Sequence, residues 1–574
     1  MSENHFSELV EQLMRGDLSR RAFIKRAIAA GASASVISTA LARAAHAAPS
    51  YREARSRRRA QSDPRTLVVL DDLQGQNWLY LDPGRIFEIN PIAAQSLIYE
   101  SLYHLPDAND LTRIEPLLAE GMPEVSDDGL TATIRIRQGV KFHNTGNVMT
   151  ADDWVFSWNR LANLKGNGSF LFTDYIERVE AVDPQTLRIT LKSPNAALVS
   201  IISSPQFAVT DSKAMREHGG SDASDADQTD TATDWINQGN SAGTGPYRLT
   251  VWDTANEVVL EAFPDYWGDP PNFDRVIFRA VSDPNTQLQL IQTGEADLAF
   301  AIDPDAVQRV LDDPNMQILE GPSLAHEYLA MHTDPAVGGP LAKKELRQAI
   351  AYAIDYDGII NGLLGGAALR PATVVPLGLL GADEAQTMAY QTDLAKAQEL
   401  FDASGVGEVE LELTYGAGSA TPAGLLRETL AAKLQADLQR INGLKIKLTP
   451  MDAQERLQQF REGKLQFTMS DWAADYPDVH TYADPFGRSL IGAASKRVAY
   501  SNAEVDRLLD EGIRELDPEK RKQIYVEIQR HLIEDAAYVV EFQPIYRSPA
   551  SRRVQGAQPH GVYILQLRYA TKTE

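Results

Sequence analysis

The 574-residue sequence contains no cysteine. This absence excludes disulfide bonds, thiolate metal sites, iron–sulfur clusters and cysteine nucleophiles. It also excludes a lipid attached to an N-terminal cysteine of the mature chain, so we expect that the protein is not a lipoprotein. A chain without thiols is indifferent to the redox state of its compartment, which is compatible with export.

Motifs for catalysis and cofactor binding are also missing. The sequence has no Gly-x-Ser-x-Gly nucleophile motif, no phosphate-binding loop and no dinucleotide fingerprint. His326 and His332 are six residues apart, which is not the spacing of a His-Glu-x-x-His zinc helix. We therefore expect no catalytic residues, no cofactor and no metal site, and a protein that is not an enzyme.

Basic residues are the minority among the charged ones. The chain has 55 Lys and Arg against 79 Asp and Glu, which gives a net charge of −24. This surplus disfavours nucleic acid and anionic membrane surfaces as partners. The chain is also longer than the size at which one hydrophobic core stops growing, so several lobes are expected.

The N-terminal segment has the features of an export signal. Ser19–Lys25 read Ser-Arg-Arg-Ala-Phe-Ile-Lys, and an Ala-rich apolar run over 27–42 precedes Ala45-His46-Ala47. With the pair Arg20 and Arg21, this segment resembles a twin-arginine translocation signal. The resemblance implies export by the Tat translocase and cleavage after residue 47. The alternative is an amphipathic basic helix on a folded domain.

The segment 48–62 follows this signal. It holds five arginines and no apolar periodicity. We interpret it as a disordered linker, with a membrane-surface tether as the alternative.

Hydrophobic periodicity predicts an α/β protein. Beyond about residue 320, strands alternate with helices, which indicates a parallel, doubly wound sheet. Thr150 and Asp153 have the spacing of a helix capping box. The predicted strands are 66–70, 131–137, 186–192, 276–280, 409–413, 444–448, 465–469 and 537–541, the last redirected by Pro544; the predicted helices are 91–105, 150–161, 285–294, 346–360, 394–404, 423–441, 453–462 and 521–534.

Two further segments have alternative interpretations. Five aspartates between Met215 and Trp235 could suggest calcium, but the Gly and the closing Glu of an EF-hand loop are missing. We predict a solvated surface loop there. Gly243-Thr244-Gly245-Pro246-Tyr247 could suggest a phosphate cradle, but no Lys-Ser/Thr pair follows, so we predict a tight turn into a strand.

The stretch Ser470–Pro485 is the candidate binding segment. It combines Trp472, Asp475, Tyr476 and Tyr482 directly after the predicted strand 465–469. Open α/β sheets hold ligands at the carboxyl ends of their strands, so a ligand is expected at this position.

The chain resembles the extracellular solute-binding proteins of ABC importers, in the oligopeptide, dipeptide and nickel class. The resemblance covers nearly the whole mature chain. It rests on segments in the same order as in that family, namely 116–120, 126–130, 139–143, 150–158, 243–247, 264–268, 294–297, 346–350 and 505–509.

The resemblance implies a two-lobed periplasmic-binding-protein fold with an additional subdomain in the first lobe. Ligand is held between the lobes and buried by hinge closure. The implied bounds are 63–320 for the first lobe, with the subdomain at about 101–234, then 321–543 for the second lobe and 544–574 for the return to the first lobe.

The resemblance also implies a ligand and its contacts. In peptide-binding members, the aspartate of a Trp-x-x-Asp segment pairs with the free α-ammonium of the peptide, and Asp475 matches that aspartate. Trp472 would form the wall beside it. Tyr476 is a further candidate ligand contact, although packing is the simpler interpretation of Tyr476 and Tyr482. A buried ammonium requires such a carboxylate partner.

Two departures from the family pattern leave the ligand class open. Relatives often have Gly before the Trp, where this chain has Asp471, and Phe-Asn where it has Met331-His332. The preferred function is capture of peptides for a membrane permease by a periplasmic monomer. The alternatives are the same role with an oligosaccharide, opine or nickel chelate, and, with less support, an exported enzyme.

Overall fold

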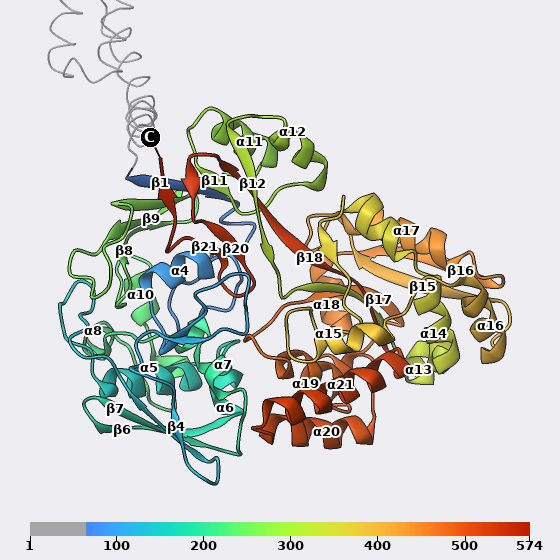
Figure 1. Ribbon diagram of the computed structural model, residues 1–574, viewed down its shortest axis with the longest axis horizontal. Helices are drawn as coiled ribbons and strands as arrows, with labels where there is room; N and C mark the ends of the chain where they lie inside the picture. The colour runs from blue at the N-terminus through green and yellow to red at the C-terminus, as the bar shows by residue number, and fades with distance from the viewer. Residues whose placement is uncertain (1–64, 574) are drawn as a thin grey trace, which may run out of the picture.

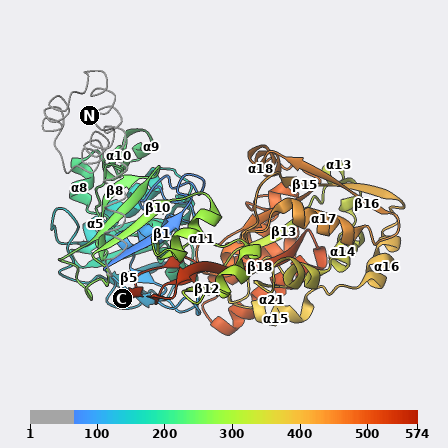
Figure 2. The same cartoon turned by 90° about the horizontal axis from the view of Figure 1, so that it is seen from above.

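Strand β18 (Tyr538–Ser551) passes from one lobe of the molecule to the other (Figures 1 and 2). It pairs antiparallel with β13 (His326–Met331) near its start and with β12 (Met316–Pro322) beyond Pro544. One 12-stranded sheet therefore extends through both lobes.

The computed structural model describes residues 65–573. The predicted signal over 1–47, with Arg20 and Arg21, and the predicted linker over 48–62 lie outside the described residues. No helix among the described residues is long and apolar enough to cross a membrane.

The sheet of the first lobe is built around β1 (Thr66–Asp71), which is buried throughout. β1 lies parallel to β10 (Arg275–Ala280) and β11 (Leu298–Ala299). β9 (Glu257–Ala262) and β8 (Tyr247–Asp253) continue the sheet in antiparallel order. Apolar side chains of α4 (Ile92–Ile98) cover one face and those of α11 (Pro284–Gln292) the other, so both faces are buried.

A subdomain of the first lobe has its own sheet and core. Its strand order is β4 (Glu124–Val125), β5 (Thr131–Arg135), β7 (Thr186–Leu191) and β6 (Ile176–Asp183). Helix α5 (Ala151–Asn163) packs against this sheet through the fully buried Trp154 and Trp158. The predicted capping box is confirmed, because the Thr150 amide donates to Oδ2 of Asp153 at 2.8 Å.

The second lobe contains a sheet covered on both faces. β15 (Val409–Gly416) lies parallel to β16 (Leu444–Met451) and β17 (Phe467–Trp472), as predicted. β13 and β18 join it antiparallel, so the sheet is mixed. One face is covered by α14 (Lys344–Ala353), α16 (Leu394–Ser404) and α17 (Arg427–Leu438); the other by α18 (Ala453–Arg461), α19 (His480–Gly487), α20 (Ala503–Arg514) and α21 (Pro518–Asp535).

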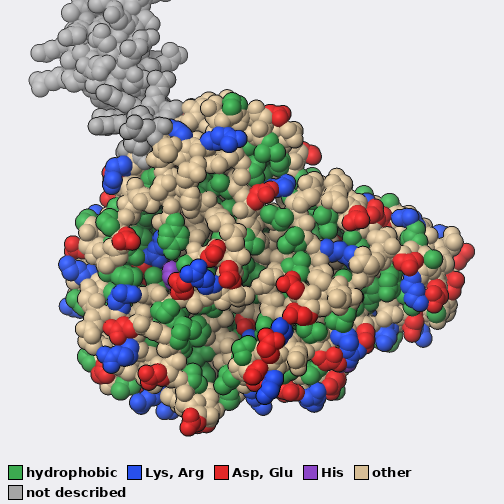
Figure 3. Space-filling model, viewed as in Figure 1, with side chains coloured by type: hydrophobic (Ala, Val, Ile, Leu, Met, Phe, Trp, Pro, Cys, Tyr) green, Lys and Arg blue, Asp and Glu red, His purple; other side chains and the backbone are tan. Residues whose placement is uncertain are grey.

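Shorter α-helices and strands lie between these elements. They are β2 (Tyr103–His104), β3 (Glu115–Pro116), α6 (Phe170–Thr173), α7 (Leu198–Ile202), α8 (Ser212–Glu217), α9 (Ala226–Thr229), α10 (Ala232–Ile236), α12 (Val307–Leu311), α13 (Pro335–Gly338), β14 (Ala368–Leu369), α15 (Ala382–Ala385), β19 (Val554–Gln555), β20 (Gln558–His560), β21 (Ile564–Gln566) and β22 (Thr571–Lys572). Acidic and basic side chains are interspersed over both lobes on the face shown in Figure 3.

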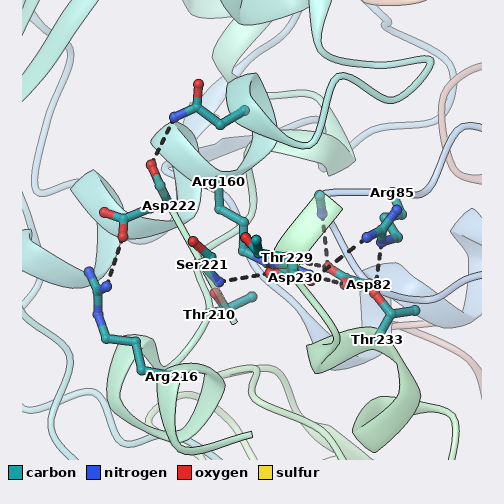
Figure 4. Close-up of polar contacts among 12 residues, drawn as sticks. Asp82, Arg85, Arg160, Thr210, Arg216, Ser221, Asp222, Thr229, Asp230 and Thr233 are labelled. Atoms are coloured by element: carbon teal, nitrogen blue, oxygen red, sulfur yellow. Dashed lines mark hydrogen bonds and ion pairs between the residues drawn. The ribbon is translucent and has the colours of Figure 1, made fainter. Parts of the chain in front are cut away.

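The prediction of a solvated loop between Met215 and Trp235 is wrong. The segment contains α8, α9 and α10, and the Asp230 side chain is fully buried. Arg160 of α5 donates to both oxygens of Asp82, each at 2.7 Å, and to both oxygens of Asp230 at 2.7 and 2.8 Å (Figure 4). The segment is ordered because the guanidinium of Arg160, distant in sequence, binds Asp230. The local composition of the segment does not indicate this contact.

Two predicted boundaries are also wrong. The helix predicted over 91–105 ends at Ile98, whose carbonyl instead accepts the amide of Gly245 at 2.9 Å. Gly243 allows this close approach, because a Cβ at Gly243 would lie 2.1 Å from the Ile98 carbonyl oxygen. The strand predicted over 537–541 continues to Ser551, since β18 changes partner at Pro544, where a missing amide is tolerated.

Candidate ligand-binding site between the lobes

The segment after β17 faces the first lobe. β17 ends at Trp472, at the carboxyl edge of the parallel strands β15, β16 and β17. Ser204 of the first lobe donates its hydroxyl to the Asp475 carbonyl at 3.4 Å. The hydroxyls of Tyr175 and Tyr476 lie 3.2 Å apart. The predicted position of the binding segment, at a strand end, therefore coincides with contacts between the two lobes.

Asp475 is partly exposed as a residue, and no cation among residues 65–573 contributes to the pKa of its carboxyl group. Its side chain accepts one hydrogen bond, from Oγ1 of Thr481 at 3.5 Å. Burial raises the pKa of Asp475 to about 7, and the Thr481 hydroxyl opposes the rise. The carboxylate is therefore poised to accept a cation or a proton near neutral pH.

Trp472 packs part of its ring against other side chains of the second lobe. Its ring meets Phe486 edge to face, with centroids 5.2 Å apart, and the Arg497 guanidinium carbon lies 5.4 Å from its centroid. The indole nitrogen is buried and has no hydrogen-bond partner among the described residues. Trp472 is partly exposed, so its remaining surface can contact a ligand through apolar and aromatic contact.

Tyr476 comes from the second lobe but is buried in the core of the first-lobe subdomain. It is 2% exposed, and its ring meets that of Tyr175 edge to face at 6.3 Å. Tyr482 is buried within the second lobe and donates its hydroxyl to the carbonyl of Leu324, between β12 and β13. These contacts agree with the packing interpretation, and a direct ligand contact by Tyr476 stays a prediction.

Asp471 belongs to a charged network that sequence reasoning missed. Arg427, in the first turn of α17, pairs with Glu327 through two hydrogen bonds of 2.8 and 2.9 Å and reaches Asp471 at 2.5 Å. The Asp471 side chain is 47% exposed, whereas Glu327 is fully buried. A basic residue in the first turn of a helix is unfavourable for the helix dipole, and this was the available signal that Arg427 has an acidic partner.

His332, which belongs to the second departure from the family pattern, is buried and hydrogen-bonded. It is 4% exposed, and its Nδ1 accepts the amide of Asp334 at 3.2 Å. His326 is buried among aromatic rings, 5.6 Å from the ring of Tyr482.

A small cavity of about 40 Å³ adjoins the site on the first-lobe side. Ser101 lines it and donates its hydroxyl to the carbonyl of Ser204 at 3.2 Å. Glu100 and Arg568, also in its lining, form an ion pair, and Glu100 accepts from the Tyr266 hydroxyl at 2.9 Å. The cavity has room for water rather than for a peptide side chain.

The two lobes joined by one sheet, with the Asp475 carboxylate near their contact, have the arrangement of a two-lobed binding protein. A sequence model of the bacterial extracellular solute-binding proteins, family 5, matches residues 113–492, which is more than half of the chain. The chain belongs to this family, which supplies solute-binding components to ABC importers.

Curated relatives and solved structures agree with this assignment. The probable D,D-dipeptide-binding periplasmic protein DdpA of Escherichia coli is 26% identical over 479 residues, covering 83% of this chain and 88% of the relative. The glutathione-binding protein GsiB of Salmonella typhi is 28% identical over 478 residues, covering 81% and 87%.

The periplasmic binding protein DppA of Helicobacter pylori, solved with the peptide STSA, superposes with a TM-score of 0.71 at 22% identity, covering 89% of this chain and 98% of that one. NikA of Brucella suis, solved with Fe(III)-EDTA, gives a TM-score of 0.75 at 24% identity, covering 89% and 100%. The predicted two-lobed α/β fold is thereby confirmed.

Proposed function

We propose that this protein captures short peptides between its lobes and presents them to the permease of an ABC importer. The observation that carries the proposal is the Asp475 carboxylate, which acts through its charge on Tyr175 of the first lobe and has no cationic partner among the described residues. A peptide α-ammonium supplies the missing charge. The names of the dipeptide-binding and glutathione-binding relatives support the same ligand class.

The site suits a ligand that is held by its backbone charge. Asp475 fixes the ammonium, and Trp472 covers the adjacent part of the peptide with an apolar surface. An ion pair enclosed between lobes is screened less than one in open solvent. Loss of either charge therefore leaves the other buried and unpaired, which raises the free energy of the complex.

Calorimetry with a tripeptide and its N-acetylated form tests the ammonium contact. We expect Asp475→Asn to weaken binding of the free tripeptide by about 2–5 kcal/mol, because the ammonium loses a buried partner. Asp402→Asn, at an exposed acid on α16, is the matched control and leaves affinity unchanged.

Equal affinity of the wild type for the free and acetylated peptides would refute the ammonium contact. Binding of neither peptide would instead favour the alternative ligands, namely an oligosaccharide, an opine or a metal chelate.

We also propose that residues 1–47 direct export through the Tat translocase and that the mature protein acts as a periplasmic monomer. Replacing Arg20 and Arg21 together by lysine should leave the precursor in the cytoplasm, measured by fractionation and immunoblotting. A periplasmic product from the double variant would contradict the twin-arginine route. Light scattering of the mature protein tests the monomer.

The proposed bounds of the mature chain are 48–62 for the linker, 63–320 and 544–574 for the first lobe and 321–543 for the second lobe. The change of partner along β18 at Pro544 supports the last of these boundaries.

A further inference from the structure

Glu541 is a buried acid that peptide capture does not use. It lies in β18, just before that strand leaves the second lobe, and its side chain is fully buried. Both of its carboxylate oxygens are buried and have no hydrogen-bond partner among the described residues. An ionised carboxylate in such a place costs several kcal/mol unless a cation or donor neutralises it.

The nearest guanidinium is already occupied by other acids. Arg427 lowers the pKa of Glu541 through its charge, but its hydrogen bonds go to Glu327 and Asp471. Its remaining contact is the hydroxyl of Ser419 at 3.2 Å. The side chain of Glu327 is itself fully buried and lies on β13, the strand that pairs with the start of β18. The buried acids Glu327 and Glu541 and the exposed acid Asp471 therefore lie around the guanidinium of Arg427, whose hydrogen bonds go to groups other than Glu541.

The other charged and titratable groups around this cluster are held by neighbours of their own. Arg456 of α18 influences Glu327 and donates to the Met469 carbonyl at 2.8 Å. Tyr356, which Glu541 influences, has the Arg370 guanidinium carbon 3.6 Å from its ring centroid. With Glu541 neutral and Glu327 ionised, Glu327 and Asp471 balance Arg427 and Arg456 in charge. Ionisation of Glu541 adds a third negative charge beside these two guanidinium groups.

We propose that Glu541 is a proton-binding site at the junction of the lobes, and that its bound proton keeps the paired strands β13 and β18 free of an uncompensated charge. Burial first, and the charge of Glu327 second, raise the pKa of Glu541 well above its usual range. Burial likewise raises the pKa of Glu327 to about 7, against the opposing charge of Arg427. Folded Glu541 therefore holds its proton more tightly than an ordinary glutamate does.

The sign of the resulting pH dependence is fixed by linkage. An unfolded glutamate loses its proton near pH 4.5, whereas folded Glu541 keeps it to a much higher pH. The folded state binds more protons in this interval, so its stability falls as pH rises. One proton changes the unfolding equilibrium constant by about tenfold per pH unit.

Denaturant unfolding across pH, in wild type and Glu541→Gln, tests the site, because glutamine has the shape of the neutral acid. Above about pH 4.5, we expect the unfolding equilibrium constant of the wild type to rise by about tenfold per pH unit relative to that of Glu541→Gln. Glu410→Gln, at an exposed position on β15, is the matched control and follows the wild type. Parallel curves for the wild type and Glu541→Gln would overturn the proposal.

Infrared spectroscopy of the wild-type chain gives a second test that needs no variant to fold. Glu327 and Asp475 have pKa values of about 7, so at about pH 8.5 they have lost their protons, and a carboxylic acid still protonated there is assigned to Glu541, whose pKa burial raises well above its usual range. We expect the carbonyl band of a protonated carboxylic acid at this pH. Absence of the band overturns the proposal. Neither test uses a peptide, so the result is independent of the proposed ligand.

Discussion

Asp475 shows how one side chain can be assigned from sequence and then given a chemical state by the structure. The motif Trp-x-x-Asp predicted the carboxylate, and the structure adds that burial raises its pKa and that no cation among the described residues lowers it. Arg427 could not be assigned in this way, because its partners Glu327 and Asp471 are 100 and 44 residues distant in sequence. Pairings over such separations leave no local periodicity.

Peptide affinity should depend on pH through Asp475. Below its pKa of about 7 the carboxyl is increasingly protonated, so binding of an ammonium weakens by about tenfold per pH unit. Affinity reaches a plateau above pH 7 and declines again above about pH 8, where the peptide α-amino group loses its proton. Calorimetry from pH 5 to pH 9 measures this profile. Each measurement is made in at least two buffers that differ in ionisation enthalpy.

Asp475→Asn provides the reference for this profile. The variant has no titrating carboxyl at position 475, so its affinity for the peptide should not increase as the pH rises toward 7. If the wild type and the variant rise in parallel, another group controls the dependence.

At the scale of elements, the predicted and observed bounds agree best where the local sequence pattern is strongest. Helix α16 has the bounds predicted for it, 394–404, because its apolar spacing and the cap at Asp393 coincide. Helix α17 begins at Arg427 rather than at 423, since Thr421 and Leu425 form a turn in which the Thr421 amide donates to the Leu425 carbonyl at 2.8 Å. The helices between Met215 and Trp235 were missed, because an ion pair with α5 orders that polar segment.

Replacing Arg160 by methionine should destabilise the first lobe. The change leaves the buried carboxylate of Asp82 without its guanidinium and Asp230 with only Arg85, whose Nη2 is 3.8 Å from its Oδ1, at a cost of about 3–5 kcal/mol. Urea unfolding measures the loss. Arg178→Met removes a guanidinium that is 58% exposed beside Glu180, and as the control it should cost less than about 1 kcal/mol.

The triple variant that also carries Asp82→Asn and Asp230→Asn should recover part of the lost stability, because no unpaired buried charge remains. An equal loss in Arg160→Met and Arg178→Met would show that the buried network contributes no more than a surface pair.

At the scale of the whole molecule, the lobes are held together by side chains as well as by strands. Tyr476 of the second lobe is buried in the first-lobe subdomain, and the Ala196 amide of that subdomain donates to the Ile513 carbonyl of α20 at 2.8 Å. The sequence predicted the two lobes through the family resemblance. It did not predict their contacts, since these depend on the relative position of two separately folded surfaces.

Tyr476→Ala should favour the open arrangement of the lobes. The buried ring contributes to contacts that exist only when the lobes meet, so its removal weakens closure by about 3–5 kcal/mol, the range for loss of a large buried aromatic side chain. Small-angle X-ray scattering at saturating peptide should give a larger radius of gyration than for the wild type, and stopped-flow release of peptide should be faster.

Tyr352→Ala, which removes a ring that packs on Tyr390 within the second lobe, is the control for this variant. It should leave both the scattering and the release rate unchanged. A Tyr476→Ala protein that scatters like the wild type would show that the strands alone set the closed arrangement.

The path of β18 also fixes the order in which the molecule can be completed during synthesis. The first lobe begins at β1, yet its sheet needs the second half of β18, and its cluster around Glu100 needs Arg568, 468 residues later in the chain. The ribosome therefore makes the whole second lobe before the first can close its core. The lobe that is begun first is finished last, and the edges of β11 and β12 that pair with β18 must remain unpaired in the meantime.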